Sequence, residues 1–158
     1  MLIKYLTRNM RAIIPQCISG VHSWRSVVRR ATFEDKNEVL ALKENDYSGL
    51  DYLPFYYESF LQNPIAIPFV ISHKAEIIGY MCGFAVDDGE TIVQRAAKIS
   101  PKFEGKGYLQ LLIQRIIQEA RQRYNLQRMA FAMDIDNPFI QRNSFWEKNT
   151  LISTKVLN

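Results

Sequence analysis

Cysteine, histidine and long apolar runs are scarce in this sequence, and each scarcity argues against a class of protein. The 158 residues include two cysteines, Cys17 and Cys82, and two histidines, His22 and His73. Two cysteines are too few for a disulfide scaffold and are typical of a reducing compartment. Two histidines argue against a multi-histidine metal site, and no apolar run reaches the roughly 18 residues of a membrane-spanning helix. We therefore expect no metal and no membrane partner.

Acidic residues are missing from the first 33 residues, which carry six lysines and arginines. The rest of the chain has 14 basic residues (20 − 6) against 16 acidic ones, so its net charge is −2. The overall charge of +4 therefore comes from the N-terminal part, while the remaining basic residues are dispersed. This distribution argues against a general nucleic-acid partner.

Residues 1–25 differ from the rest of the chain in composition. They are basic and acid-free, and they mix apolar residues with serine and threonine, as mitochondrial transit peptides do. The alternative is a poorly ordered extension that carries no targeting signal, and we prefer it because this composition is common. We expect a disordered basic extension over 1–25 and a cytoplasmic protein, with a mitochondrial location as the alternative.

Residues 26–158 predict a single α/β domain. Alternating or continuous apolar runs predict strands, and apolar residues at helical spacing predict helices. The predicted strands span 27–31, 68–72, 76–86, 90–99, 129–133 and 151–156, and the predicted helices span 33–44, 53–62, 107–124 and 138–149. Consecutive strands followed by a strand–helix–strand crossover indicate a mixed, mainly antiparallel sheet flanked by helices on both faces.

The loop between the predicted strand 90–99 and helix 107–124 carries the clearest chemical pattern. Gly105 and Gly107 allow the backbone to curl so that several N–H groups point to one place, directly before a helix N-terminus. Lys102 and Lys106 add positive charge. Together these features favour an anion site suited to a pyrophosphate. The alternative is a turn that only connects the two elements. The chain has neither Gly-x-Gly-x-x-Gly nor Gly-Lys-Ser/Thr, which argues against dinucleotide and P-loop sites.

The segment Lys102-x-x-Gly105-x-Gly107, after a strand that ends in Ile99-x-Pro101, resembles the acetyl-coenzyme A loop of the GNAT acyltransferase superfamily. The segment Asn143–Asn149 resembles the end of that superfamily's last helix. The resemblance implies a GNAT-like fold and acetyl-CoA as co-substrate. It also implies a pantetheine arm that lies along the end of the strand 90–99, and a following strand that diverges from it. By position, it implies cofactor contacts at Ile99, Lys102, Phe103, Glu104, Gly105, Lys106, Gly107 and Tyr108.

Three segments are similar to the histidine N-acetyltransferase-like subgroup: residues 49–54, 87–91 and 99–107. The resemblance implies an N-acetyltransferase that acts on a small amine such as the amino acid histidine. Family domains usually finish with a hairpin after the last helix, so we expect the C-terminal strands to be incomplete. The alternative function is a catalytically silent acyl-CoA-binding or regulatory domain.

The sequence departs from the family at positions that carry chemistry. Lys102 stands where arginine or glutamine is usual, and Trp146 stands where many members have a tyrosine that protonates the leaving thiolate. Gln94 and Arg95 occupy positions where many members have a glutamate or histidine that deprotonates the acceptor amine. We assign no catalytic residue. A free α-amine with a pKa of about 8 tolerates the absence of a base.

Aromatic residues cluster around the break between the first two predicted helices. We expect Tyr47, Asp51 and Tyr52, in the loop, to contact the acceptor, and acids nearby to suit a cationic or zwitterionic amine. At helical spacing, Leu53, Tyr56, Tyr57 and Phe60 are predicted to pack in the core. We interpret Cys82 as a packing residue because no histidine or acid adjoins it in the strand.

Overall fold

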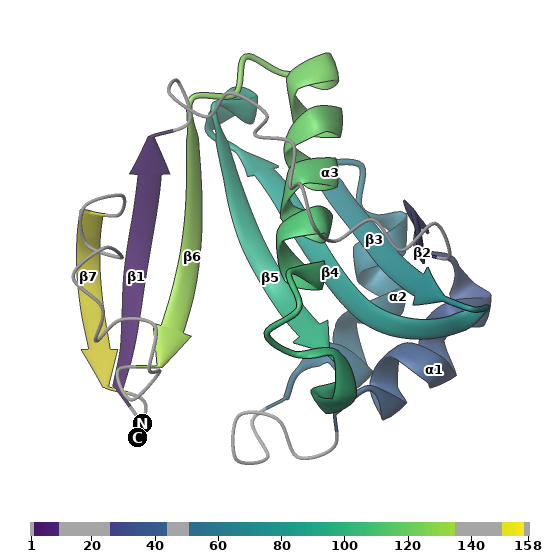
Figure 1. Ribbon diagram of the computed structural model, residues 1–158. Helices are drawn as coiled ribbons and strands as arrows, with labels where there is room; N and C mark the ends of the chain where they lie inside the picture. Colours follow the sequence, from purple (N-terminus) through teal and green to yellow (C-terminus); the bar gives the residue numbers. More distant parts are fainter. Residues whose placement is uncertain (1, 10–25, 44–50, 135–149, 157–158) are drawn as a thin grey trace.

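The computed structural model describes residues 2–9, 26–43, 51–134 and 150–156 (Figure 1). Its strands are β1 (Leu2–Asn9), β2 (Ser26–Arg30), β3 (Ala66–His73), β4 (Glu76–Val86), β5 (Thr91–Ile99), β6 (Arg128–Asp134) and β7 (Thr150–Val156). Its α-helices are α1 (Lys36–Ala41), α2 (Leu53–Gln62) and α3 (Tyr108–Arg123), and short 3-10 turns stand at Phe33–Asp35, Asp87–Gly89 and Pro101–Phe103.

The described strands form one sheet in the order β2-β3-β4-β5-β6-β1-β7. Neighbouring strands are antiparallel except β5 and β6, which are parallel because α3 crosses over between them. This arrangement confirms the predicted mixed, mainly antiparallel sheet. Tight turns with positive φ at Lys74, Ala75, Asp87, Asp88 and Gly89 connect β3 to β4 and β4 to β5.

Helices cover both faces of the sheet, as the sequence predicted (Figure 1). Helix α3 packs on β3, β4 and β5 from one side, while α2 contacts β3 and α1 contacts β4 from the other. Apolar side chains of alternate strand residues form a core on each face, with Ile67, Phe69 and Ile71 under α3 and Ala66 and Val70 under α1 and α2. The alternation follows from the two-residue period of a strand.

The first helix begins with an acid-rich turn, as the sequence predicted, but it ends earlier than expected. The carboxylate of Asp35 accepts hydrogen bonds from the Thr32 amide at 2.8 Å and from the Arg29 guanidinium at 2.7 Å. Arg29 thereby lowers the pKa of Asp35, although burial partly opposes the shift. The helix ends at Ala41, whereas the apolar spacing predicts continuation to about residue 44. The predicted helix 138–149 lies outside the described residues.

The N-terminal segment differs from the sequence-based expectation. The sequence predicts no element within residues 1–25, yet Leu2–Asn9 forms β1, which pairs with β6 on one side and β7 on the other. The short segment lacks a strong period-two pattern, so its pairing depends on two partner strands from the far end of the chain. The strand expected at 151–156 is present as β7, and its neighbour in the sheet is β1 rather than β6.

Candidate active site

The loop between β5 and α3 turns tightly around two glycines. Gly105 has φ 72° and Gly107 has φ 83°, the left-handed conformation that glycine adopts without a steric penalty. Gly107 is the residue before the first turn of α3, and the carbonyl of Gly107 accepts a hydrogen bond from the Leu111 amide. A Cβ added at Gly105 would project into open space, so the outer surface of the loop is accessible. The unpaired amides of the first turn of α3 make this end of the helix suitable for an anion.

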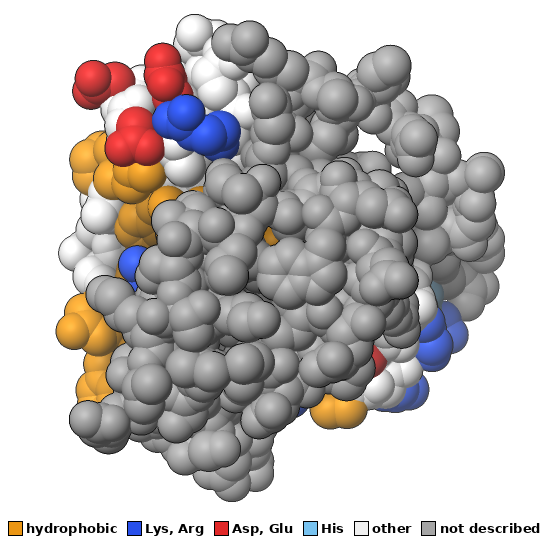
Figure 2. Space-filling model, turned by 90° about the vertical axis from the view of Figure 1, so that its left-hand side faces the viewer, with side chains coloured by type: hydrophobic (Ala, Val, Ile, Leu, Met, Phe, Trp, Pro, Cys, Tyr) orange, Lys and Arg blue, Asp and Glu red, His pale blue; other side chains and the backbone are white. Residues whose placement is uncertain are grey.

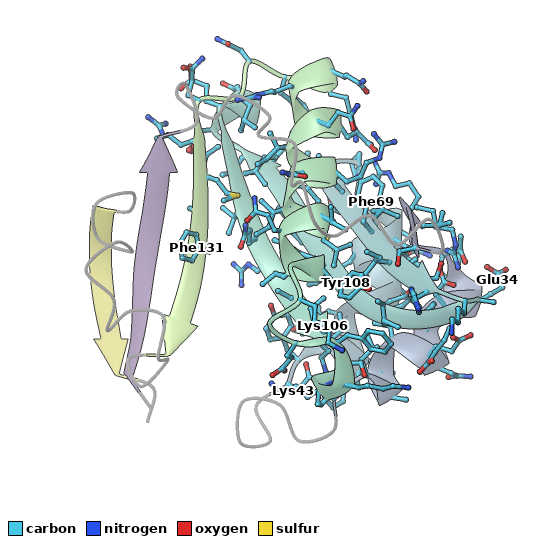
Figure 3. All side chains as sticks on the ribbon, viewed as in Figure 1. Glu34, Lys43, Phe69, Lys106, Tyr108 and Phe131 are labelled. Carbon is cyan, nitrogen blue, oxygen red and sulfur yellow. The ribbon has the colours of Figure 1, made fainter. Side chains whose placement is uncertain are left out.

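Two lysines bring positive charge to this loop. The ammonium groups of Lys102 and Lys106 lie 5.4 and 5.3 Å from the centre of the Phe103 ring, and Lys106 donates a hydrogen bond of 2.9 Å to the carbonyl of Lys102. Glu104 forms an ion pair of 3.5 Å with Lys43. Lys43, Lys106 and Tyr108 lie at the same end of the molecule (Figure 3). The structure therefore concentrates basic groups where the sequence predicts a pyrophosphate.

Three of the predicted cofactor residues, Ile99, Phe103 and Tyr108, pack their side chains in or against the hydrophobic core. Phe103 and Tyr108 are buried and pack edge to face with ring centres 5.7 Å apart. Ile99 is half-buried, and its side chain occupies the space that a side chain at Gly79 would need, since a Cβ there would lie 2.5 Å from Ile99 Cδ1. These three side chains support the loop from beneath. Their direct contact with a cofactor stays a prediction.

Strand β5 contains a bulge in its second half. Cys82 of β4 pairs with Arg95, but Tyr80 pairs with Lys98, so β5 has one residue more than β4 over this stretch. Ala96 adopts φ 50° at the bulge. Its amide donates a hydrogen bond of 3.1 Å to the hydroxyl oxygen of Tyr52, which precedes α2. The bulge thus directs one backbone N–H away from the ladder and toward a side chain.

Strands β5 and β6 diverge after Val93, before the bulge. Their parallel pairing covers only Thr91–Val93 of β5 and Arg128–Ala130 of β6, and the two strands part below it (Figure 1). The sequence analysis expected this divergence from the family resemblance, and the pairing confirms it. The backbone of β5 after Val93 is therefore not paired with β6, so it has hydrogen-bonding groups to offer a ligand.

An aromatic pocket of about 450 Å³ opens on the α2 side of the bulge. Its volume is in the range of small-molecule sites, about 300–1,000 Å³. Its lining residues are mostly aromatic or aliphatic and come from α2 with the residue before it, from β4 and from β5: Tyr52, Tyr56, Phe60, Phe84, Val86, Val93 and Arg95. The rings of Phe60 and Phe84 stand edge to face with centres 4.8 Å apart.

The structure places some of the residues predicted for the core in the lining of the pocket. Tyr52 lines the pocket, while Tyr47 lies outside the described residues. Leu53 and Tyr57 are buried as predicted. Tyr56, expected in the core, is 54% exposed and lines the pocket with the half-buried Phe60. The helix buries only one narrow stripe, so the two rings beside that stripe remain available to a ligand.

Tyr52 keeps its proton at neutral pH. Burial raises the pKa of its hydroxyl, and the hydrogen bond from the Ala96 amide and the charge of Arg95 oppose the shift only in part. Because the hydroxyl oxygen accepts from Ala96, its own proton is available for donation. Tyr52 can therefore act as a hydrogen-bond donor beside the bulge.

Asp51 is engaged away from the pocket by a buried lysine that the sequence analysis did not identify. The Lys98 side chain is 1% exposed, and its ammonium group lies 2.5 Å from Asp51 Oδ2 and 3.3 Å from the carbonyl of Lys43. The other oxygen of Asp51 accepts from the Leu53 amide at the start of α2. The alternation that places Ala96 inside was a usable signal, since Lys98 is two residues further along the strand. The predicted contact of Asp51 with the acceptor stays a prediction.

Acidic residues of the turn before β5 lie at the strand end opposite the glycine loop. Asp87 and Glu90 are exposed, and Arg128 lies 3.9 and 3.6 Å from their carboxylates. Acidic and basic side chains lie side by side at the upper edge of the face in Figure 2. These exposed acids therefore belong to a solvated turn at the end of β5 that lies away from the glycine loop.

Cys82 is buried, and burial raises its pKa to about 12, so it is a thiol at neutral pH. In the described part of the chain, no group of three or more histidine, cysteine, aspartate or glutamate side chains could hold a metal. None of the described helices has the length and apolarity to cross a membrane. Trp146 lies outside the described residues.

Two curated relatives are about a third identical to this chain over the residues that align with it. A histidine N-acetyltransferase from Oreochromis niloticus is 32% identical over 111 residues, which cover 70% of this chain and 32% of that protein. A histidine N-acetyltransferase from Scomber australasicus is 30% identical over 94 residues, which cover 60% and 28% of the two chains. This chain thus spans about a third of the length of these relatives. The matches confirm the resemblance to the histidine N-acetyltransferase-like subgroup.

Solved structures match the fold at low sequence identity. The ribosomal-protein-S18-alanine N-acetyltransferase of Escherichia coli matches with a TM-score of 0.63 at 11% identity, over 77% of this chain and 74% of that one. A predicted acetyltransferase from Clostridium acetobutylicum, solved with acetyl-CoA, matches with a TM-score of 0.58 at 14% identity, over 77% and 86%. The model of the acetyltransferase (GNAT) family matches residues 30–149, the stretch that holds the diverging strands, the bulge and the glycine loop. The chain belongs to the GNAT family.

Proposed function

We propose that this chain is an acetyl-CoA-dependent N-acetyltransferase that acetylates the amine of a small molecule, an amino acid such as histidine. The observation that carries the proposal is the bulge in β5. It directs the Ala96 amide toward the hydroxyl of Tyr52, at the edge of an aromatic pocket and where β5 leaves β6. A hydroxyl donor held in place and an adjacent acceptor pocket favour acyl transfer to an amine.

The residues of the glycine loop fit the phosphates of coenzyme A. A tight turn with two positive-φ glycines, open space above Gly105 and the first turn of α3 provide amide donors for a pyrophosphate. Lys102 and Lys106 add charge, although lysine lacks the planar fork of an arginine. Acetyl-CoA supplies the activated acetyl group as a thioester.

The chain's own groups serve the transfer in two ways. The Ala96 amide donates to the Tyr52 hydroxyl oxygen, so it holds that hydroxyl in place at the bulge and leaves the hydroxyl proton free to donate. The Tyr52 hydroxyl, held protonated by burial, can donate to a leaving thiolate. This role would replace the tyrosine that the sequence lacks at residue 146.

The described lining of the pocket contains no aspartate, glutamate or histidine that could act as a base. With this lining, an acceptor amine that is already neutral in solution can attack without an enzyme base. A free α-amine has a pKa of about 8, about two units below that of a lysine side chain, so a useful fraction is neutral near physiological pH. This favours an amino acid over a protein lysine.

The test is turnover against pH, measured as thiol release from acetyl-CoA with histidine, lysine and a histone-like peptide as acceptors. We expect histidine to be preferred, and its rate to rise up to pH 8–9, roughly, without an enzyme base near neutrality. A preference for the peptide, or binding of acetyl-CoA without acetylation of any amino acid, would contradict the proposal.

The cofactor loop has its own test. Replacing Gly107 by valine forces a β-branched residue into φ 83°, so Gly107→Val should abolish coenzyme A binding in isothermal titration while the protein still folds. Gln118→Ala, at an exposed position toward the far end of α3, is the matched control and should leave coenzyme A affinity unchanged. Equal affinity of the parent and Gly107→Val would overturn the assignment of the loop.

The alternative is an acyl-CoA-binding or regulatory domain without catalysis, and the lack of a base among the described lining residues favours it. In that case coenzyme A binds and no amine releases thiol. The predicted location in the cytoplasm, with the mitochondrion as alternative, stays a prediction.

A further inference from the structure

Arg95 is the one charged side chain among the described residues that line the aromatic pocket. Its neighbours there are the rings of Tyr52, Tyr56, Phe60 and Phe84 together with two valines. Arg95 is exposed, so an anion can reach its guanidinium group, whose planar fork of donors fits a carboxylate.

Three described acids on the elements that build the pocket, or next to them, are paired with other cations. Asp51 binds Lys98, Glu58 binds Lys36 at 2.7 Å, and Glu90 lies by Arg128. None of the ion pairs in the described part of the chain involves Arg95. The described lining therefore has a positive charge with no negative partner in an ion pair between described residues.

Arg95 also has a defined position relative to the bulge. It directly precedes Ala96, whose amide meets the Tyr52 hydroxyl, and its positive charge lowers the pKa of that hydroxyl. In an α-amino acid a single carbon joins the amine to the carboxylate. An amine placed at the Ala96 bulge therefore brings its carboxylate to the neighbourhood of the preceding residue.

We propose that Arg95 binds the α-carboxylate of the acceptor, so that the pocket selects amines with a free carboxylate over amines without one. The inference rests on the proposed function and names the substrate class of that site. An arginine fork fits both oxygens of a carboxylate, and the surrounding rings can pack against a flat side chain such as imidazole. A lysine inside a peptide chain has no free α-carboxylate to offer.

The experiment combines two acceptors with two proteins. Histidine and histidinamide differ in the carboxylate, and Arg95→Gln removes the charge but keeps a polar side chain. We expect kcat/KM of the parent to favour histidine, and Arg95→Gln to lower it about 10- to 100-fold for histidine, mainly through KM, while histidinamide changes little. Each protein gives a ratio of kcat/KM for histidine to kcat/KM for histidinamide. Dividing this ratio in the parent by the ratio in Arg95→Gln cancels the difference in amine basicity between the two acceptors. Arg95→Lys should restore part of the preference.

Arg121 is an exposed residue of α3, on the opposite face of the sheet. Arg121→Gln is therefore the matched control and should leave kcat/KM for both acceptors unchanged. Histidine binding to the coenzyme A-loaded protein is measured by calorimetry as a readout that needs no turnover. Binding that depends on Arg95 without acetylation would support the carboxylate site and reject the proposed activity. Acetylation or binding of histidine that is equal in the parent and Arg95→Gln would reject the carboxylate site and leave the activity intact. Failure of the parent to bind histidine at all would reject the site.

Discussion

The two faces of the sheet between β3 and β5 bury different kinds of side chain. The cluster under α3 contains aliphatic, aromatic and methionine side chains and no charged residue. The face under α1 and α2 buries Lys98 and Asp35 beside its apolar cluster, and it also holds the aromatic pocket. Alternate residues of the same strands face the two sides, so β5 itself supplies the buried Lys98 and the chain before α2 supplies its partner Asp51.

We infer that the α3 face contributes mainly to the stability of the fold, whereas the α1–α2 face holds the groups of the proposed site. Helix α3 approaches β4 so closely that a Cβ at Gly83 would lie 2.6 Å from Ile116 Cγ2, which indicates tight apolar packing. The opposite face buries the charged side chains of Lys98 and Asp35, which are costly to bury unless they are paired. Substitutions at Lys98, Leu112 and Tyr80 test whether the two faces differ in this way.

The largest effect should come from Lys98→Met, which removes the buried charge from the α1–α2 face. Asp51, 17% exposed, would lose its ammonium partner, and breaking such a pair typically costs about 3–5 kcal/mol of unfolding free energy. Denaturant unfolding measures the loss. Because Asp51 also fixes the start of α2 next to Tyr52, acetylation should fall as well.

The matched control is Lys36→Met, which breaks an ion pair of 2.7 Å between more exposed partners. Its cost should stay below about 1 kcal/mol because water solvates both charges. Similar losses for the two variants would show that the burial of Lys98 carries no special cost.

An intermediate effect is expected for Leu112→Ala on the α3 face. Leu112 is fully buried in the apolar cluster, and truncation leaves a cavity that costs about 3 kcal/mol. Activity per folded molecule should stay near that of the parent, because the pocket lies on the other face. Gln110→Ala, exposed on the same helix, should change neither stability nor activity. A rise in KM for the acceptor in Leu112→Ala would contradict the separation of the two faces.

The smallest effect should come from Tyr80→Phe. The Tyr80 hydroxyl is buried with no hydrogen-bond partner among the described residues, and the Cys82 thiol interacts with it electrostatically. Burial also raises its pKa. Removing an unsatisfied hydroxyl should leave stability unchanged or raise it by up to about 1 kcal/mol.

Tyr57→Phe is the control for this variant, since the Tyr57 ring centre lies 5.5 Å from that of Tyr80 and its hydroxyl donates 2.8 Å to the Thr32 carbonyl. It should lose about 1 kcal/mol because that carbonyl loses its donor. Thermal or denaturant unfolding of both variants decides, and a larger loss in Tyr80→Phe would show that its hydroxyl is satisfied.

Local patterns predicted the regular elements well. The helix expected at 53–62 is α2 at the same bounds, and the strand expected at 76–86 is β4. The helix at 107–124 differs from α3 by one residue at each end. Such signals are contained in short stretches: Pro64 follows one helix end, glycines mark turns, and apolar spacing follows the period of the element. The predicted glycine loop was locally encoded for the same reason.

Long-range contacts were not predictable in the same way. The pairing of β1 joins residues at the two ends of the chain, and the ion pair of Lys98 with Asp51 spans 47 positions. The exposure of Tyr56 depends on which stripe of α2 meets the sheet, and helical spacing alone assigned it to the core. Each outcome depends on which elements become neighbours, and no short window of sequence contains that information.

The strands and helices from β2 to β6, the two-glycine loop before α3 and the family could be inferred from the sequence, because residues close together along the chain encode each of them. The tertiary structure was needed to show that β1 joins the sheet, that β5 bulges at Ala96 beside Tyr52, and that Arg95 lines an aromatic pocket while Asp51 pairs with Lys98. A bulge is a mismatch between two strands, and a pocket lies between three elements. Their physical cause is the packing of distant segments against one another.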